Sequence, residues 1–321
     1  MGLFDFFKSK PAEAEAPTSE ESAIAILHDD GIRAMKMGEV SYAEKCFTKA
    51  LQLQDDLRMV KLLAEAKLLL QNFEEALPLL QRVAEAEPEN VEAQLLLGQT
   101  YGRLGNYAAM KVIADKLLES LPEDARALYL GGEADQGVGD NASAIARLTQ
   151  AIELQPRYSA PRLLRAKILA GMGLHKEVLE DTEALLELDG ENEEFLLLQA
   201  DSLVAIGETE KAEEVYSQLL AANPFSRDGV LHFAKFYCHT SHIDKALELC
   251  NEAIELQPDF APAYRLRSSI KLQLNDEQGA ADDLKKSQEL QPEEGEKADG
   301  EFTSVENKMA ERYRNMNPYG F

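Results

Sequence analysis

The sequence predicts an all-α protein, a solenoid of about eight helix–turn–helix repeats, and three observations support this fold class. First, the chain has 321 residues, of which 45% are hydrophobic, with Leu and Ala abundant, a mixture typical of helical proteins with a sizeable core. Second, two apolar-periodic segments of roughly 14 residues recur in each repeat, which is the signature of helices. Third, proline recurs every 34 residues, with one gap where Gly190 stands instead, at Pro88, Pro122, Pro156, Pro224, Pro258 and Pro292.

The 34-residue period defines eight repeats, the first of them one residue short: 24–56, 57–90, 91–124, 125–158, 159–192, 193–226, 227–260 and 261–294. Position 8, in the first helix of each repeat, is always small: Gly31, Ala64, Gly98, Gly132, Ala166, Ala200, Ala234 and Ser268. Position 20, in the second helix, is alanine in six repeats: Ala43, Ala76, Ala144, Ala212, Ala246 and Ala280. Small side chains at one place on each helix let two helix backbones approach closely, so each repeat is expected to be an antiparallel hairpin.

A turn separates the two helices of each repeat, and glycine often marks it: Gly38, Gly105, Gly139, Gly173 and Gly207. The recurring proline then ends the second helix, because proline has no N–H to donate and restricts the residue before it. Each repeat is therefore bounded by residues that stop helices.

The third repeat carries the most specific pattern, with Leu97-Gly98, Tyr101, Gly105-Asn106-Tyr107 and Pro122. A 34-residue helix–turn–helix with small, aromatic, small and proline residues at these spacings resembles the tetratricopeptide repeat. The resemblance covers residues 24–294. Three residues depart from the pattern without disturbing the register: Asp30, Gly131 and Thr182. The resemblance implies a right-handed superhelix whose first helices line a concave channel that grips a peptide or a helix of a partner protein.

An N-terminal segment, residues 1–22, precedes the repeats, which we place at 23–294. It joins the apolar peptide MGLFDFFKSK at 1–10 to a linker at 11–22. The linker is rich in Pro, Ala, Glu and Ser, a composition typical of disorder. The peptide is expected either to be a loose terminus or to dock on a partner or, weakly, on a membrane, because so few apolar residues give only marginal membrane affinity.

A C-terminal segment, residues 295–321, follows the repeats and begins with a mostly polar link. Thr303 and Glu306 then form a capping-box pattern that predicts a helix over 303–316. A solenoid needs something to cover its last apolar face, so this helix is expected to be an end cap. The tail NPYGF that follows it is not expected to be catalytic.

The charge balance excludes some classes of partner. The chain has 33 Lys and Arg against 58 Asp and Glu, a net charge of −25, which would repel nucleic-acid phosphates and anionic lipid headgroups. Its three cysteines, Cys46, Cys238 and Cys250, do not form a disulfide framework. No apolar run approaches the ~18 residues needed to span a bilayer, and no signal peptide is evident. The sequence therefore predicts a cytoplasmic protein.

Catalytic and cofactor signals are weak. The segment QGVGDNA at 136–142 matches a dinucleotide fingerprint in form, but it falls on a turn between two helices, where glycine is expected anyway. The seventh repeat holds His232, Cys238, His239, His242 and Cys250. Their spacing is too loose for a metal site, which needs converging ligands, and favours a divergent turn instead. We therefore expect no cofactor, no metal and no enzymatic activity.

The candidate binding residues follow from the resemblance, which implies that positions 2, 5, 6 and 9 of each first helix face the channel. Position 5 is leucine or tyrosine from the third to the seventh repeat: Leu95, Tyr129, Leu163, Leu197 and Leu231. Basic residues at positions 2 and 9 complete the predicted groove: Arg126, Lys167 and Lys235. The alternative is that these leucines pack against the neighbouring repeat. For position 6 the two interpretations are equal, whereas for position 5 we favour the channel.

The resulting hypothesis is a non-catalytic scaffold that binds a partner peptide or amphipathic helix in an apolar groove. Recognition of a C-terminal carboxylate is not expected. Repeats that clamp such tails carry Lys at position 5 and Asn at positions 6 and 9, whereas positions 5 and 9 here hold Leu95 with Gln99, Tyr129 with Glu133, and Leu163 with Lys167. Two alternatives remain: an accessory subunit of an enzyme complex, and a membrane-recruitment adaptor acting through residues 1–10.

Overall fold

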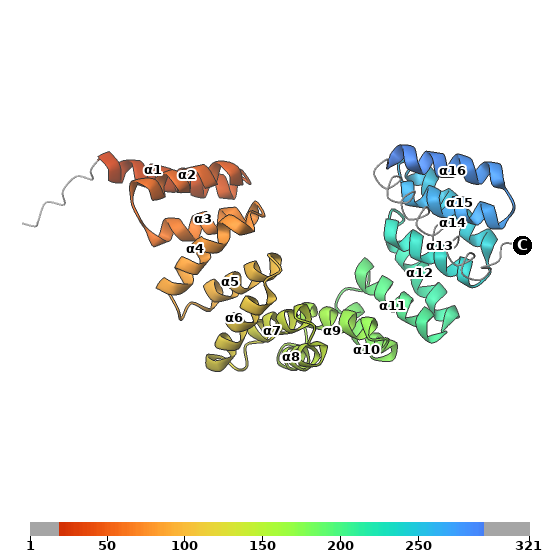
Figure 1. Ribbon diagram of the computed structural model, residues 1–321, viewed down its shortest axis with the longest axis horizontal. Coiled ribbons are helices and arrows are strands. Elements are labelled where there is room, and N and C mark those ends of the chain that lie inside the picture. Colours follow the sequence, from red (N-terminus) through yellow and green to blue (C-terminus); the bar gives the residue numbers. More distant parts are fainter. Residues whose placement is uncertain (1–18, 292–321) are drawn as a thin grey trace, which may run out of the picture. The chain divides into compact units, whose positions relative to one another are not determined.

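The computed structural model describes residues 19–291 of the chain (Figure 1). This part contains sixteen helices and no strand, which confirms the predicted all-α repeat fold. The helices are α1 (Ser19–Lys36), α2 (Val40–Leu53), α3 (Leu57–Leu69), α4 (Phe73–Ala86), α5 (Val91–Arg103), α6 (Tyr107–Ser120), α7 (Ala125–Gly137), α8 (Asn141–Leu154), α9 (Ser159–Gly171), α10 (His175–Leu186), α11 (Glu193–Ile206), α12 (Thr209–Ala222), α13 (Arg227–His239), α14 (Ile243–Leu256), α15 (Ala261–Gln273) and α16 (Glu277–Leu290).

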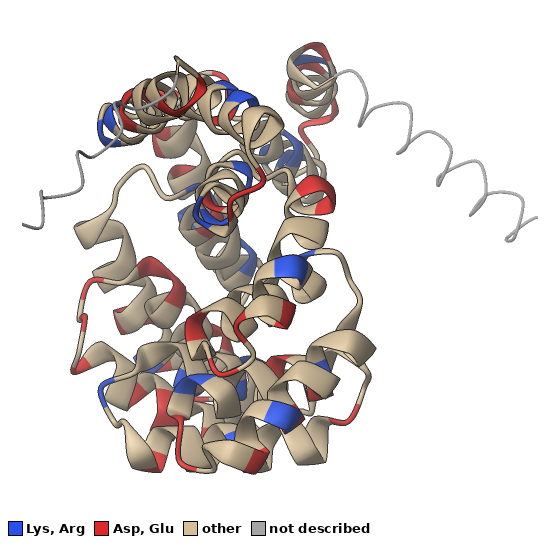
Figure 2. Cartoon of the chain, turned by 90° about the vertical axis from the view of Figure 1, so that its left-hand side faces the viewer, with Lys and Arg blue, Asp and Glu red and all other residues tan. Residues whose placement is uncertain are grey.

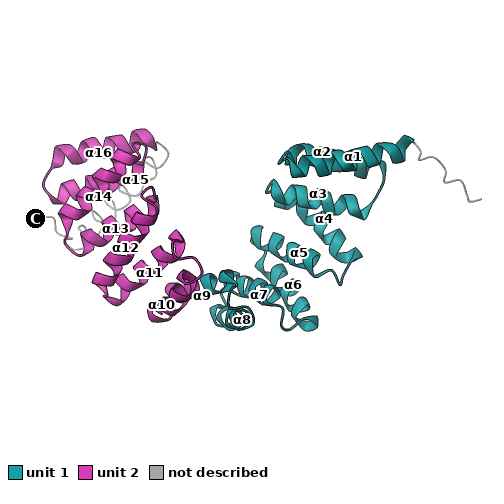
Figure 3. Ribbon diagram, turned by 180° about the vertical axis from the view of Figure 1, so that it is seen from behind, with its two compact units in different colours: residues 1–164 teal, residues 165–321 magenta. Residues whose placement is uncertain are grey.

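The chain divides within α9 into two compact units (Figure 3). Unit 1 ends at Leu164 and unit 2 begins at Arg165. Within unit 1, each helix from α1 to α8 packs against the next one along the chain, and α5 also contacts α7. Within unit 2 the same holds from α10 to α16, and α11 contacts α13, which contacts α15. The odd-numbered helices α5 and α7 thus lie side by side in unit 1, as do α11, α13 and α15 in unit 2. We call the odd-numbered helices of each unit its inner layer.

The small residues at positions 8 and 20 lie where the two helices of a hairpin meet, and all of them are buried. A Cβ atom added to Gly132 would lie 2.8 Å from the Leu148 side chain, and one added to Gly31 would overlap the ring of Phe47. Such separations are shorter than ordinary van der Waals contact between carbon atoms. The close approach of helix backbones that the sequence predicts is therefore present in these repeats.

The turn between the helices has one conformation throughout the described repeats. Position 15 has a positive φ in all eight: five are the predicted turn glycines, with φ between 71° and 86°. The other three are Gln71, Ser241 and Asn275, with φ of 59°, 63° and 62°. L-residues enter this left-handed region at a cost that glycine avoids. The hairpin geometry therefore imposes this conformation even where the sequence offers no glycine.

The N-terminal end of the described chain differs from expectation in one respect. Helix α1 begins at Ser19, inside the segment expected to be a linker, and Glu20 and Glu21 occupy its first turn. Acidic side chains there interact favourably with the partial positive charge of a helix N-terminus, which explains the earlier start. The apolar peptide at 1–10 and the predicted cap at 303–316, with the tail after it, lie outside the described residues. None of the helices at 19–291 combines the length and apolar character needed to cross a bilayer.

Candidate partner-binding surface

The inner layer of unit 1 contains a mainly apolar cavity between α3 and α5, which we call the apolar cavity. Its volume is about 570 Å³. It is lined by Lys61, Glu65, Leu68, Leu69, Leu80, Val83, Asn90, Glu92, Ala93 and Leu96. Leu80 and Val83, each 3% exposed, belong to the core, whereas Leu69 is 59% exposed. A solvent-exposed leucine beside a buried apolar floor is a surface that loses unfavourable hydration when it is covered.

Charged residues border the apolar cavity, and acidic ones predominate. The Lys61 ammonium donates hydrogen bonds of 2.6 and 2.7 Å to the Glu87 carboxylate, and these bonds, with one from Asn90, lower the pKa of Glu87. The positive charge of Lys61 is therefore compensated within the protein. Glu65 forms no ion pair with any described residue, and Glu92 has only a 3.4 Å contact with Arg126. The border thus presents negative charge to a ligand.

A second cavity, the polar cavity, lies one repeat further along, between α5 and α7. Its volume is about 340 Å³. Its lining residues are Gln99, Gly102, Arg103, Tyr107, Met110, Tyr129, Glu133 and Gln136. Burial raises the pKa of Glu133, against the opposing effects of a hydrogen bond from Tyr129 and the charge of Arg103. The ring of Tyr129 packs edge-on against Tyr158, with 5.6 Å between the centroids. Tyr129 is thus a predicted groove residue of unit 1 that lines a cavity.

Leu95 lies in the core rather than on the inner surface. Its side chain is 4% exposed and packs in a cluster with Met110, Leu117 and Leu130. Its neighbour Leu96, at position 6, lines the apolar cavity instead. In the third repeat the favoured assignment of position 5 to the groove is therefore wrong, because α7 packs over that side of α5.

The other predicted residues of unit 1 are accessible to different degrees. Leu163 is half-buried. Arg126 is exposed, but its guanidinium lies 2.9 Å from the carboxylate of Asp124, the residue that caps the N-terminus of α7. Arg126 therefore already has an ion-pair partner, in addition to its longer contact with Glu92.

In unit 2 the predicted residues Leu231 and Lys235 come together at a cavity of about 290 Å³ between α13 and α15. Pro262, Arg265, Leu266 and Ser269 complete its lining. Leu197 instead packs partly buried against the core cluster of this unit. Lys167 is exposed and forms a 2.5 Å ion pair with Glu194. Each unit thus contains some of the residues predicted to form the groove.

Two histidines of the seventh repeat, His232 and His242, have separate partners. His232 Nδ1 lies 3.0 Å from the carboxylate of Asp201, and this hydrogen bond raises the pKa of His232. His242 bonds to Thr240 at 3.0 Å. Cys250 is fully buried, and burial raises its pKa to about 12. Among residues 19–291, no group of three or more His, Cys, Asp or Glu side chains could hold a metal ion.

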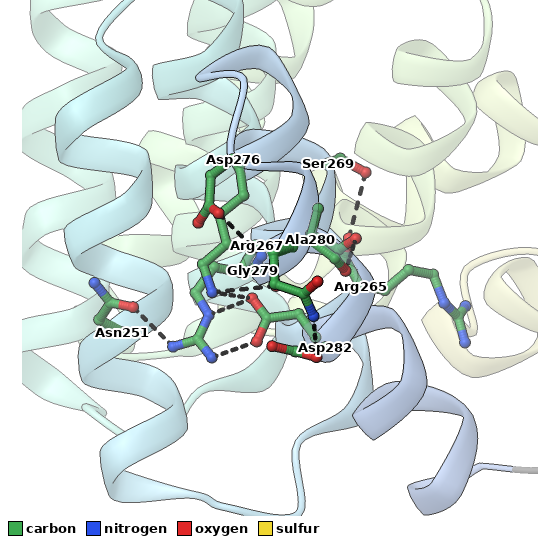
Figure 4. A network of polar contacts seen from close by, with 12 residues as sticks. Asn251, Arg265, Arg267, Ser269, Asp276, Gly279, Ala280 and Asp282 are labelled. Carbon is green, nitrogen blue, oxygen red and sulfur yellow. Dashed lines mark hydrogen bonds and ion pairs between the residues drawn. The ribbon is translucent and has the colours of Figure 1, made fainter.

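Buried ion pairs between positions 7 and 23 are a feature that the sequence analysis missed. Arg267 Nε and Nη2 donate to the two oxygens of Asp283 at 2.8 and 2.6 Å, and Nη1 donates to Asn251 (Figure 4). In the fifth repeat Arg165 forms the same two bonds with Asp181, at 2.9 and 2.5 Å. Aligning the repeats and comparing charges at these two positions would have revealed the pairs.

The fourth repeat places a buried carboxylate differently. Asp135 is fully buried, and it forms ion pairs of 2.5 Å with Lys111 and 2.9 Å with Arg147. The guanidinium of Arg147 occupies the space where a Cβ atom of Gly131 would lie. The glycine that departs from the repeat pattern is therefore what makes room for this arginine.

Charge of both signs is distributed over the helices, with acidic residues more frequent (Figure 2). Much of the basic charge is paired in the contacts just described. The surface of the described part of the chain is therefore mainly acidic. Exceptions are the apolar cavity and the cavity lined by Lys235 and Arg265.

Comparison with known proteins supports the repeat assignment. Tetratricopeptide-repeat profiles match residues 67–132 and residues 197–261. Searching the curated protein sequences gave no match. Among solved structures, PilW, described as a widely conserved type IV pilus biogenesis factor, is 20% identical, with a TM-score of 0.57 over 64% of this chain and 96% of PilW. A tetratricopeptide repeat protein from Parabacteroides merdae is 16% identical, with a TM-score of 0.51 over 84% of this chain and 94% of that protein.

At these identities the structural likeness establishes the fold alone. The repeat profiles match in both units, at α3–α7 and α11–α15. Together with the 34-residue period and the buried small residues, they identify the repeats. The chain belongs to the tetratricopeptide repeat family.

Proposed function

We propose that this chain is a non-catalytic interaction scaffold that binds an apolar segment of a partner protein in the apolar cavity between α3 and α5. Proteins built of tetratricopeptide repeats act in general as protein–protein interaction scaffolds. The observation that carries the finer proposal is the exposed Leu69 beside the buried Leu80 and Val83. A volume of about 570 Å³ is within the range of protein ligand pockets.

The expected ligand is a short peptide or one face of an amphipathic helix. Apolar anchors would fill the space between Leu69 and Leu96, while polar residues of the ligand remain at the border. Because Glu65 and Glu92 line this border, basic residues beside the anchors would be favoured electrostatically. The net charge of −25 also favours a basic partner through long-range attraction.

The test uses the full chain and a displayed library of random 15-residue peptides. Selected peptides are expected to contain apolar anchors flanked by Lys or Arg. Leu69→Asp should weaken their binding at least ~10-fold in calorimetric titration, because an apolar anchor would meet a charge. Leu69 is already largely exposed, so the helical signal and melting temperature should change little.

The matched control is Val112→Asp on α6, a residue 66% exposed and outside the cavity lining. It introduces the same charge in the same unit and should leave peptide affinity unchanged. Equal binding by wild type and Leu69→Asp would place the peptide site elsewhere and refute the proposed cavity.

A further inference from the structure

The first ten residues, MGLFDFFKSK, contain an apolar cluster in an otherwise acidic chain. Leu3, Phe4, Phe6 and Phe7 are followed directly by Lys8 and Lys10, against a single acidic residue. Apolar aromatic side chains gain free energy from any surface that removes them from water. The nearby lysines favour a surface of negative charge. These two requirements match the lining of the apolar cavity.

The structure provides a short path from the start of α1 to this cavity. The first turns of α1, at Glu21 and Ile24, line a cavity of about 310 Å³ together with Arg58 and Met59 at the start of α3. Further along the same helix, α3 contributes Lys61, Glu65, Leu68 and Leu69 to the apolar cavity. With a rise of 1.5 Å per residue, Arg58 and Leu69 are separated by about 16 Å along the axis of α3.

The chain between the apolar cluster and α1 is long enough to cover this path. Residues 8–18 connect Phe7 to Ser19, and eleven residues can extend to about 36 Å. That reach is about twice the 16 Å along α3, which leaves the remainder for the step from Ser19 to the start of α3. A tether of this kind also holds the peptide at an effective concentration on the order of 1 mM, so that even a weak contact is populated.

The chemistry of the two surfaces is complementary. The apolar cavity has a buried floor at Leu80 and Val83, and Leu69 beside it is exposed. Glu65 and Glu92 lie among its lining residues. Two phenylalanines followed by lysines would place aromatic rings over the floor and ammonium groups near these carboxylates, which satisfies both the apolar and the charged groups of the site.

We propose that the N-terminal peptide of this chain docks intramolecularly in the apolar cavity of unit 1, with Phe6 and Phe7 as anchors and Lys8 and Lys10 near Glu65 and Glu92. The docking itself does not depend on the proposed function. Its regulatory consequence, that the peptide competes with a partner for the cavity, does rest on that function.

The experiment uses the full chain with the photoreactive residue p-benzoylphenylalanine in place of Phe6. Irradiation is expected to link position 6 to residues of α3 and α5 that line the cavity. Mass spectrometry of the digested protein would identify the linked fragments. Leu69→Asp should reduce the yield of this link several-fold, whereas Val112→Asp should leave it unchanged. The yield should also be independent of protein concentration, since the contact is within one molecule.

Three results would overturn the proposal. Links spread over many helices, insensitive to Leu69→Asp, would mean that the peptide has no defined site here. Linked dimers whose yield rises with concentration would mean that the peptide binds a second copy. Links to phospholipid in anionic vesicles, with loss of the link to α3 and α5, would mean that the peptide binds membranes instead.

This experiment and the test of the proposed function can fail separately, because no partner is present in the first. If the cavity binds library peptides but not position 6, docking of the N-terminus is wrong and the scaffold proposal stands. If both hold, Phe6→Ser with Phe7→Ser should raise the affinity of the full chain for a selected peptide several-fold by removing the competitor.

Discussion

The fourth and eighth repeats both bury a carboxylate between cations, but with opposite arrangements. In the fourth repeat the acid is Asp135 at position 11 and the arginine is Arg147 at position 23. In the eighth repeat the acid is Asp283 at position 23, and Lys271 stands at position 11. Each carboxylate is nearly inaccessible, with 0% and 6% of the side chain exposed. The same site in the hairpin therefore accepts a charge pair of either polarity.

The sources of the cations explain what the difference means for the solenoid. Asp135 on α7 also binds Lys111, which comes from α6 in the preceding repeat. Asp283 on α16 binds Arg267 and Lys271, which both come from α15 of its own hairpin. The first network therefore joins two repeats by an ion pair, whereas the ion pairs of the second lie within one hairpin and its contact with the preceding repeat is the neutral hydrogen bond from Arg267 to Asn251. In a solenoid, where each repeat depends on its neighbours, the first is the more consequential.

The largest predicted effect is on the network that joins repeats. Asp135→Asn removes a fully buried charge that pairs with Lys111 and with Arg147, although Arg147 keeps its ion pair with Asp115. It should lower the free energy of unfolding by about 3 kcal/mol. Asp283→Asn should cost less, because no neighbouring repeat loses a partner. Urea unfolding followed by circular dichroism measures both. Equal losses for the two variants would contradict the proposed difference between the networks.

The second-largest predicted effect is the destabilisation of the eighth repeat by acid. Burial acts to raise the pKa of Asp283, but hydrogen bonds from Arg267 and Lys271 outweigh it and the pKa is lowered. A carboxyl group with a depressed pKa stabilises the folded state above its unfolded pKa, and this contribution is lost as the pH falls through the folded pKa. The difference in unfolding free energy between wild type and Asp283→Asn should thus shrink on titration from neutral pH to pH ~3. A difference independent of pH would refute this linkage.

Replacing the lysine of each network should show the same difference between the two networks, with smaller losses of stability. Lys111→Met removes the ion pair between two repeats and should cost about 1–2 kcal/mol. Lys271→Met leaves the two bonds between Arg267 and Asp283 in place and should cost about half as much. Because the stem of methionine is similar in length, lost packing is minimal. A larger cost for Lys271→Met would reverse the assigned roles.

The smallest effect concerns the glycine that admits Arg147. Gly131→Ala would place a Cβ atom against this guanidinium. The resulting displacement should outweigh the better helix propensity of alanine and give a net loss of about 1 kcal/mol. The matched control is Gly171→Ala in α9, where nothing lies within 4 Å of the added Cβ. This control should be neutral or stabilise the chain by about 0.5–1 kcal/mol. Stabilisation by both variants would show that Arg147 can move freely.

The candidate surface was predicted less completely than the fold. Positions 5 and 6 are adjacent on the first helix, and whether either of them meets solvent depends on how closely the next first helix packs. In the third repeat Ala127 and Ala134 of α7 belong to the same core cluster as Leu95. These small residues let α7 approach α5, so that Leu95 is covered. The distance between the first helices of adjacent repeats cannot be predicted from the residue pattern within one repeat.

The sequence by itself determined the helical period, the number of helices in the described repeats and the places where backbones approach, because these depend on residues that recur every 34 positions. The tertiary structure alone decided the rest. It imposed positive φ on Gln71, Ser241 and Asn275, since the hairpin requires that conformation whatever the residue. It also brought Lys111 to Asp135 across two repeats and opened the apolar cavity between α3 and α5, because both arise from the packing of one repeat against the next.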